Sequence, residues 1–330
     1  MLDVSTGLRP TQGKLLAAFA SVYLIWGSTY LAIRFAIETM PPHLMAAVRF
    51  LVAGAILYAW ARWRGAPRPT LTNWRAATVV GGFLLLGGNG AVVWAETRVP
   101  SGLTALLVAM VPIWMLVLEM LPRLGGRKPR AAVVAGILLG LIGLFVLVAP
   151  GRLAGRVDPL GAAVLLLGCL CWAFGSLYSR GAALPKSGFL AAAMEMVAGG
   201  ALLLLFGLAT GQAEEVALSA ISARSLLSLA YLTVFGSLVG FTAYIWLLGA
   251  TTPARVSTYA YVNPIVAVLL GWAFANEPMS LRTLIAAAVI IGAVALIIRY
   301  GARREVSAPA PAEAAPVPEL LARTTAGGRA

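Results

Sequence analysis

Apolar residues recur along this chain in ten long runs, separated by short polar connections. A helix needs about 20 mostly apolar residues to cross a bilayer, and each run has about that length. The connections are rich in proline, glycine and basic residues, which is typical of turns. The pattern therefore predicts an all-α integral membrane protein with ten transmembrane helices. The predicted spans are residues 15–37, 43–61, 76–96, 102–121, 131–149, 160–180, 188–208, 226–249, 254–275 and 280–299.

Composition supports the membrane assignment. Hydrophobic residues make up 60% of the 330 residues and charged residues 11%, with a mean hydropathy of +0.89, whereas about 25% of a soluble domain is charged. The formal charge of +13 comes from short basic clusters between the apolar runs. Such clusters are topology signals. We therefore expect the chain to lie in a lipid bilayer and not to bind nucleic acid.

Lysine and arginine are distributed unequally between the two sets of helix ends. Sixteen lie at one set and five at the other, and the cytoplasmic side of a membrane protein carries the excess. Both termini are therefore predicted to be cytoplasmic, with residues 1–14 as the N-terminal segment. Residues 300–330 are rich in Ala and Pro and have no periodicity, so they are predicted to be a disordered cytoplasmic tail.

The two halves of the chain resemble each other. The pattern GS-x-Y at 27–30 recurs at 175–178, and VPI at 111–113 corresponds to NPI at 263–265, about 150 residues later in each case. Five spans per unit is an odd number, so the second unit must enter the membrane upside down. Inverted repeats are typical of transporters, whose substrate site lies near the midplane between the repeats. The predicted domains are two inverted five-helix repeats, residues 15–149 and 160–299.

Several segments together resemble one known family. They are IWGSTY in the first span, MAAVRF at the start of the second, GNGAVVWAE in the third, VPSGLTALLVAMVPIW in the fourth and YAYVNPIVAVLLG in the ninth. Over roughly residues 12–300 the chain is similar to the EamA family of the drug/metabolite transporter superfamily. The resemblance implies a bacterial inner-membrane carrier, often an exporter of amino acids or related metabolites, with a cavity between its repeats. It does not identify the solute.

The leading hypothesis is a secondary transporter of a small organic solute that works by alternating access. The chain has no G-x-x-x-x-G-K-[ST] motif, which argues against ATP hydrolysis. Its one histidine, His43, argues against a metal site and against an enzyme. No cofactor is expected. The alternatives are a multidrug or nucleotide-sugar carrier of the same superfamily, or a passive channel, and either a monomer or a homodimer is compatible with the sequence.

Several aromatic and polar residues lie where a lipid-facing helix needs none. At a rise of about 1.5 Å per residue, Trp26 lies about 16 Å into its span, near mid-bilayer, although Trp and Tyr normally gather at the membrane interfaces. Trp26 and Tyr30 share a helix face, whereas the small residues 27–29 are expected to serve helix packing. The predicted cavity residues are Trp26, Tyr30, Arg49, Asn89, Trp172, Glu195, Tyr259 and Asn263.

Two of these residues carry charge inside the predicted spans. Arg49 lies about 10 Å into the second span and has no acid within one helical turn. A cation at that depth is costly unless it is paired or faces water. Arg49 is expected either to bind a solute carboxylate or to form a structural pair with Glu195 or with helix carbonyls. Glu195 is also the candidate proton-binding residue, because an ionised carboxylate is costly inside a span.

Two prolines near the midplane are predicted to interrupt their helices. Pro112 and Pro264 each remove one backbone donor and free the carbonyl four residues earlier. Interrupted helices at the midplane can present carbonyls to a solute or an ion. The alternative is a kink that only shapes packing.

Arg34 and Glu96 are expected near the outer ends of their helices. Arg34 is four residues before Glu38 and is expected to pair with it within one helix. Glu96 follows an apolar run and is expected to lie at the membrane interface, beside Arg98.

Overall fold

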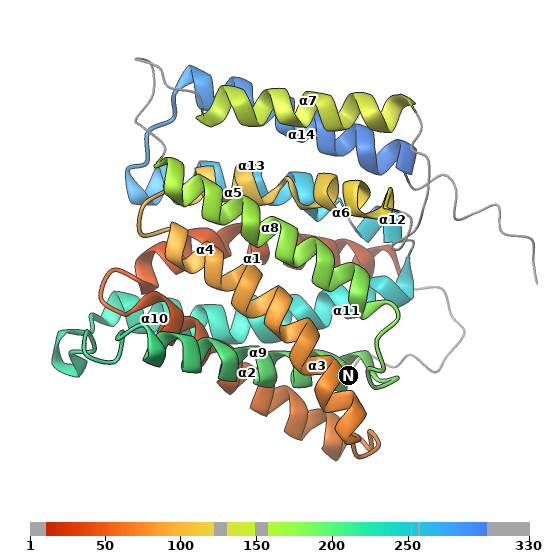
Figure 1. Ribbon diagram of the computed structural model, residues 1–330, viewed down its shortest axis with the longest axis vertical. Coiled ribbons are helices and arrows are strands. Elements are labelled where there is room, and N and C mark those ends of the chain that lie inside the picture. Colours follow the sequence, from red (N-terminus) through yellow and green to blue (C-terminus); the bar gives the residue numbers. More distant parts are fainter. Residues whose placement is uncertain (1–10, 122–130, 149–157, 252, 257, 302–330) are drawn as a thin grey trace, which may run out of the picture.

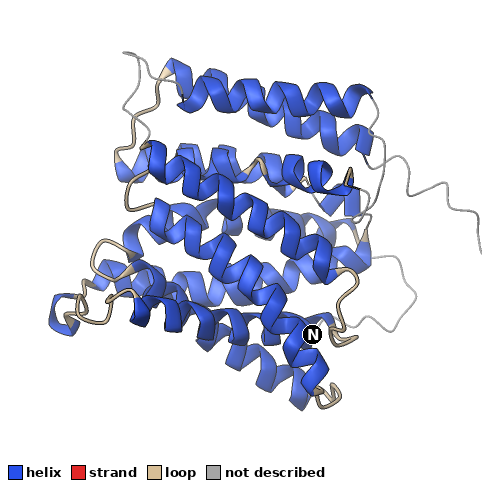
Figure 2. Ribbon diagram, viewed as in Figure 1, coloured by secondary structure: helices blue, strands red, loops and turns tan. Residues whose placement is uncertain are grey.

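The computed structural model describes residues 11–121, 131–148, 158–251, 253–256 and 258–301. In these segments every regular element is a helix, as Figure 2 shows. The predicted all-α class is therefore confirmed. Most of the two predicted terminal segments, 1–14 and 300–330, lies outside the described residues.

Eight helices in the described segments are long and apolar enough to cross a membrane. Two shorter apolar helices, Ala131–Leu147 and Tyr259–Ala275, lie where the fifth and ninth spans are predicted. Such lengths and composition support a membrane protein with many spans. The eight longer helices are Gln12–Ala36, Pro42–Trp63, Leu71–Ala95, Ser101–Glu119, Pro159–Ser179, Gly188–Ala209, Ala223–Leu247 and Leu281–Tyr300.

The helices lie side by side, and their connections gather at two opposite edges of the bundle (Figure 1). At one end of the row, α7 (Ala131–Val148) packs along α14 (Leu281–Gly301). At the other end, α2 (Pro42–Trp63) packs along α9 (Gly188–Ala209). Each pair joins one helix from the first half of the chain to one from the second half.

The third predicted span contains a π-helical segment. Here α3 (Leu71–Gly81) continues through the π-helix η1 (Gly82–Asn89) into α4 (Gly90–Ala95). π-helical insertions are rare and are frequently found at functional sites. The segment widens the helix in the middle of its span.

The eighth predicted span has the same construction. After a short 3-10 turn, η2 (Leu218–Ala220), α10 (Ala223–Tyr231) continues through the π-helix η3 (Leu232–Val239) into α11 (Gly240–Ala250). Both π-helices are 8 residues long. They occupy corresponding positions in the two halves of the chain.

The two proline-containing spans differ from each other. α5 (Ser101–Val108) ends before α6 (Val111–Glu119) begins, and Pro112 lies in the first turn of α6, where the missing N–H would have no helical partner. In the ninth span, α12 (Pro253–Val256) precedes α13 (Tyr259–Ala275), which continues through Pro264. The helix is therefore not broken at Pro264, and the alternative of a kink stays a prediction. A single missing donor is tolerated because neighbouring helices enclose this buried position.

The two central helices make matching contacts. α1 (Gln12–Ala36) packs against α13, α11 and η3, whereas α8 (Pro159–Ser179) packs against α6, α5, α4 and η1. Each central helix thus contacts the third and fourth spans of the opposite half. In Figure 1 α1 and α8 lie in the middle of the row, between the α7–α14 and α2–α9 pairs.

Glycines allow the backbones of the packed helices to approach closely. A Cβ atom at Gly199 of α9 would lie 2.8 Å from the carbonyl oxygen of Gly81 in α3, and one at Gly81 would lie 2.6 Å from the carbonyl oxygen of Glu195. Small residues at helix crossings are typical of membrane proteins, where packing rather than hydrophobic burial drives association. Large apolar side chains such as Leu167 and Phe145 are exposed on the outside, as a lipid-facing surface requires.

Candidate functional site

The centre of the bundle holds an aromatic cluster around Trp26. The indole Nε1 of Trp26 donates to the carbonyl oxygen of Gly236 at 3.1 Å. The Trp26 ring meets Tyr259 edge to face at 5.2 Å between centroids and also contacts Tyr244 at 5.2 Å. Phe241 adds a third ring at 6.2 Å. Trp26 and Tyr259, two predicted cavity residues from α1 and α13, are therefore neighbours.

Arg49 also contacts η3, the π-helix that contains Gly236. Its side chain is buried, at 6% exposure, and its Nε donates to the Ser237 hydroxyl at 2.9 Å. The Arg49 guanidinium also lies 4.7 Å from the centre of the Phe50 ring. Trp26 belongs to α1 and Arg49 to α2. Their side chains bind two consecutive residues of η3, Gly236 and Ser237.

The expected structural pair between Arg49 and Glu195 is not formed. Among the described residues, the ion pairs within 4.0 Å are Arg98–Asp158, Arg180–Glu119 and Arg224–Glu38. Glu195 lies on α9, which packs along the helix that carries Arg49. The acidic side chain is partly buried and the arginine takes a neutral hydroxyl instead. Arg49 therefore keeps donor capacity for a further acceptor.

A second polar cluster lies at the ends of α1, α4 and α5, and sequence reasoning misjudged it. Arg34 Nη1 donates to the backbone oxygen of Glu96 at 2.7 Å. Glu38 pairs instead with Arg224 at 3.4 Å, and that arginine also stacks on Phe35. The expected Arg34–Glu38 pair is therefore wrong, because a carbonyl at the end of α4 offers Arg34 an acceptor that no local pattern reveals.

Glu96 is buried rather than interfacial. Its exposed fraction is 0%, and neither carboxylate oxygen has a hydrogen-bond partner among the described residues. Arg98, the expected neighbour, points elsewhere: it pairs with Asp158 at 3.3 Å and lies over the Trp94 ring at 4.8 Å. The interfacial expectation for Glu96 is therefore wrong, and the carboxyl group is enclosed within the protein.

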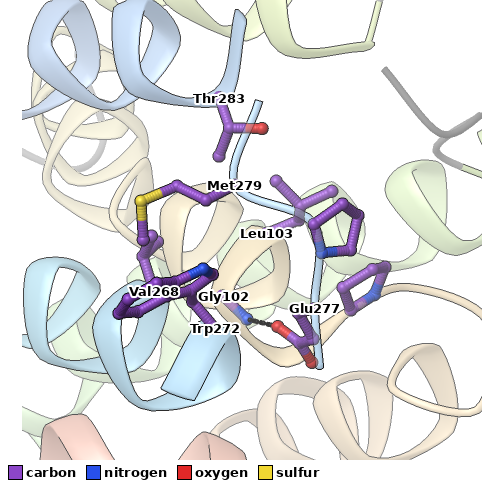
Figure 3. A pocket seen from close by; sticks show the side chains of 9 residues that line it. Gly102, Leu103, Val268, Trp272, Glu277, Met279 and Thr283 are labelled. Atoms are coloured by element: carbon purple, nitrogen blue, oxygen red, sulfur yellow. Dashed lines mark hydrogen bonds between the residues drawn. The ribbon is translucent and has the colours of Figure 1, made fainter. Parts of the chain in front are cut away.

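Glu277, which sequence reasoning missed, holds the N-terminus of α5. Its Oε1 accepts from the backbone N–H of Ser101 at 2.6 Å and its Oε2 from that of Gly102 at 2.9 Å, as Figure 3 shows for Gly102. These two donors are free because they start a helix, whose N-terminus attracts negative charge. A Cβ at Gly271 would lie 2.3 Å from the carboxylate, so any side chain there would displace Glu277. The sequence signal was an acid directly after an apolar run.

The remaining predicted residues fall into two groups. Asn263 on α13 is buried near α1, and its Oδ1 has no hydrogen-bond partner among the described residues. Its backbone oxygen would lie 3.2 Å from a Cβ at Gly27. Asn89 ends η1, and Trp172 of α8 lies against the same π-helix, 2.7 Å from where a Cβ of Gly88 would be. Trp26 and Arg49 thus contact η3, whereas Asn89 and Trp172 lie at η1.

A cavity of about 480 Å³ lies beside η1, between the first and second halves of the chain. It is lined mainly by apolar side chains and by glycines of η1, α4 and α8. At one end His43 and Gln212 bind each other. The His43 backbone N–H donates to Oε1 of Gln212 at 3.0 Å, and Nε2 of Gln212 lies 2.7 Å from Nδ1 of His43. None of the predicted cavity residues lines it. Cys171 does, whereas Cys169 is buried in packing.

Comparison with known proteins agrees with the resemblance. A protein of Escherichia coli strain K12, the uncharacterized inner membrane transporter YedA, is 42% identical over 284 residues, covering 86% of this chain and 90% of its own. The uncharacterized transporter YvbV of Bacillus subtilis is 24% identical over 290 residues, covering 88% and 92%. One crystal structure aligns with a TM-score of 0.60 at 21% identity, covering 90% of this chain and 100% of its own, and shows a similar fold.

The family assignment rests on two matches within one chain. The EamA-like transporter family matches residues 13–149 and again residues 159–299. These two segments contain the two π-helices and all the central contacts described above. The chain is a membrane transporter and belongs to the EamA-like transporter family.

Proposed function

We propose that this protein exports small metabolites, such as amino acids or related compounds, across the inner membrane by alternating access. Its domains are two inverted five-helix units, residues 15–149 and 160–299. Three observations support this arrangement. The family matches the chain twice, each half contains a π-helix at a corresponding position, and the contacts of α1 have counterparts in those of α8. In such transporters the solute site lies between the units.

The observation that carries the proposal is the convergence of Trp26 and Arg49 on η3. An arginine guanidinium binds a carboxylate through two parallel hydrogen bonds. Aromatic faces attract an ammonium group. The Trp26 ring with Tyr259 and the partly satisfied Arg49 therefore suit the two ends of an amino-acid-like solute. Asn263, with its free Oδ1, supplies a further acceptor.

Orientation in the membrane follows from charge. The excess of Lys and Arg lies at the helix ends that include residues 62–75, so this side is proposed to be cytoplasmic, with both termini. The E. coli relative is named as an inner membrane transporter, which supports the same membrane for this chain. Export then requires the solute to enter from the side of the α2–α3 connection.

The large apolar cavity favours one alternative, a carrier of apolar or amphipathic drugs. A volume of about 480 Å³ is within the range of small-molecule sites. Leu167 lines this cavity and is exposed, so the cavity reaches the outer surface of the bundle. A drug carrier would use this cavity rather than the Trp26 and Arg49 region, so variants in the two places separate the two functions.

The deciding experiment is a transport screen in inverted membrane vesicles. Uptake of radiolabelled amino acids, purines, sugars and cationic drugs is measured with the parent and with two variants, Arg49→Lys and Gly90→Leu, the second of which fills the cavity. An amino-acid exporter accumulates an amino acid in a manner sensitive to Arg49→Lys. Accumulation of a drug that is blocked by Gly90→Leu and unaffected by Arg49→Lys would favour the multidrug carrier. No difference from empty vesicles for any compound would refute export.

A further inference from the structure

We propose that Glu96 is a proton-binding residue of the transport cycle, holding a proton in the conformation described here and releasing it when the surrounding helix ends separate. The inference rests on the proposed transport function and adds the coupling ion. It differs from the sequence-based candidate, Glu195, which is only partly buried. Among the acids in the part of the chain that the structure describes, Glu96 is the one with no exposed surface.

The first argument is the cost of an ionised carboxylate in this position. Both Glu96 oxygens are shielded from solvent and have no donor within hydrogen-bond distance among the described residues. A buried charge without hydrogen bonds is far more costly than a buried neutral polar group, so the group neutralises instead. Three other acids differ in this respect: Glu38 and Glu119 form ion pairs, and Glu277 accepts two backbone N–H groups.

The second argument is the charge of the neighbours. Glu277 interacts electrostatically with Glu96 from the α13–α14 connection, and Arg34 of α1 opposes it with positive charge. Tyr30 of α1 lies within electrostatic range of Glu96 and of Cys169 on α8. Glu277 accepts two backbone N–H groups at the N-terminus of α5. A negative charge on Glu96 would therefore be opposed by the neighbouring Glu277 carboxylate.

Arg34 does not cancel this effect. Its Nη1 is engaged with the Glu96 backbone oxygen at 2.7 Å, not with the carboxylate. Burial, and then the Glu277 charge, raise the pKa of Glu96 well above its ordinary value, against the lowering effect of Arg34. Arg34 is nevertheless positioned to stabilise the ionised form once α1 and α4 shift. The same arginine therefore suits both steps, proton binding and proton release.

Access for the proton is provided next to Glu277. A small cleft of about 10 Å³, lined by Gly102, Leu103, Trp272 and Glu277 among others (Figure 3), is large enough for about one water molecule. The hydroxyls of Ser101 and Thr104 are at 0% exposure and have no hydrogen-bond partner among the described residues. These hydroxyls can accept or pass a proton once water reaches them. The cluster thus has an entrance and intermediate groups.

The first test needs no solute. Thermal unfolding in detergent is followed by tryptophan fluorescence between pH 5 and pH 9 for the parent and for Glu96→Gln, a neutral isostere. Since the raised pKa of Glu96 means that the folded state binds the proton more tightly, the parent should lose stability as pH rises above the ordinary glutamate pKa. Glu96→Gln should lack this loss, so that it equals the parent at low pH and melts higher at high pH.

The matched variants sharpen this test. Glu277→Gln should melt lower than the parent at every pH above the ordinary glutamate range, because it weakens the cap of α5. Glu38→Gln, which removes a half-exposed carboxylate from its ion pair with Arg224, should keep the pH slope of the parent. A Glu96→Gln curve that runs parallel to the parent, or that falls further below it as pH rises, would overturn the inference, because it would mean that Glu96 is ionised or does not titrate.

The second test uses reconstituted vesicles and a solute identified by the screen. At one proton per solute, a pH gradient of one unit drives about tenfold accumulation, and Glu96→Gln should abolish this accumulation while exchange of labelled for unlabelled solute continues. Glu38→Gln serves as the surface control. Gradient-driven accumulation by Glu96→Gln would overturn the inference. If no solute moves but the unfolding curves behave as expected, the proposed export fails and the protonation of Glu96 stands.

Discussion

The indole Nε1 of Trp26 lies 3.1 Å from the carbonyl oxygen of Gly236 and donates to it. The two residues are 210 positions apart in the chain, so this bond joins the first helix to the π-helix of the second half. The same indole ring meets Tyr259 edge to face, so the bond holds Trp26 between the π-helix and α13.

Removing the Trp26 ring should impair transport more than it impairs folding. Trp26→Ala deletes one hydrogen bond, worth about 1 kcal/mol net, and opens the aromatic cluster. We expect transport to fall about tenfold or more while membrane abundance stays near that of the parent. Tyr259→Ala and Asn263→Ala should act in the same direction, whereas Leu138→Ala should be tolerated, because that side chain is 56% exposed. Parent-like transport by all three variants would contradict the assignment of this wall.

Gly240 should tolerate no side chain as long as Trp26 is present. A Cβ at Gly240 would lie 2.5 Å from Trp26 Nε1, so Gly240→Ala should displace the indole and destabilise the protein by about 1–3 kcal/mol. Melting temperature in detergent measures this effect. In a Trp26→Ala background the same substitution should cost clearly less, as expected for coupled neighbours. Gly292→Ala is the control, since nothing lies within 4 Å of a Cβ there; equal losses at Gly240 and Gly292 would refute the contact.

Conservative substitution of Arg49 should show whether its side chain serves solute binding or folding. Arg49→Lys keeps the charge but loses the planar fork and the 2.9 Å bond to Ser237. A hydrogen bond to a charged group is worth about 1.5–3 kcal/mol, so the apparent KM should rise about tenfold or more at unchanged abundance. Ser237→Ala should raise the apparent KM less than Arg49→Lys does.

The double variant Arg49→Leu with Glu195→Leu tests the structural alternative for Arg49. Because the two side chains form no ion pair in this fold, the second substitution should not restore the abundance lost by Arg49→Leu. Recovery of abundance would support a structural pair between them. Normal transport by an abundant Arg49→Leu protein would exclude both roles.

The orientation can be measured with single cysteines. After Cys169 and Cys171 are replaced by serine, a cysteine at the exposed Ala213 should react with an impermeant thiol reagent in intact cells. A cysteine at the exposed Pro67, in the α2–α3 connection, should react only after lysis. The reverse pattern would show that the termini are on the outer side.

The apolar runs of the sequence determined which segments become helices. In a bilayer each spanning segment must satisfy its own backbone, so a run of about 20 apolar residues has essentially one solution. Eight of the predicted spans lie on helices long and apolar enough to cross a membrane, and the other two lie on shorter apolar helices. The π-helices within 82–89 and 232–239 were not foreseen, because widening of a helix depends on what packs against it and not on a periodic pattern.

The partners of the polar residues were decided by the tertiary structure. Trp26 and Tyr259 could be selected from their depth in the membrane, but the bond from Trp26 to Gly236 could not. Glu96 follows an apolar run, and this position predicts an interfacial residue. It is buried instead, where Arg34 of α1 binds its backbone oxygen. Glu277 caps a helix 176 residues away. A sequence pattern reports spacing along one helix, whereas desolvation and hydrogen bonding depend on which helices meet.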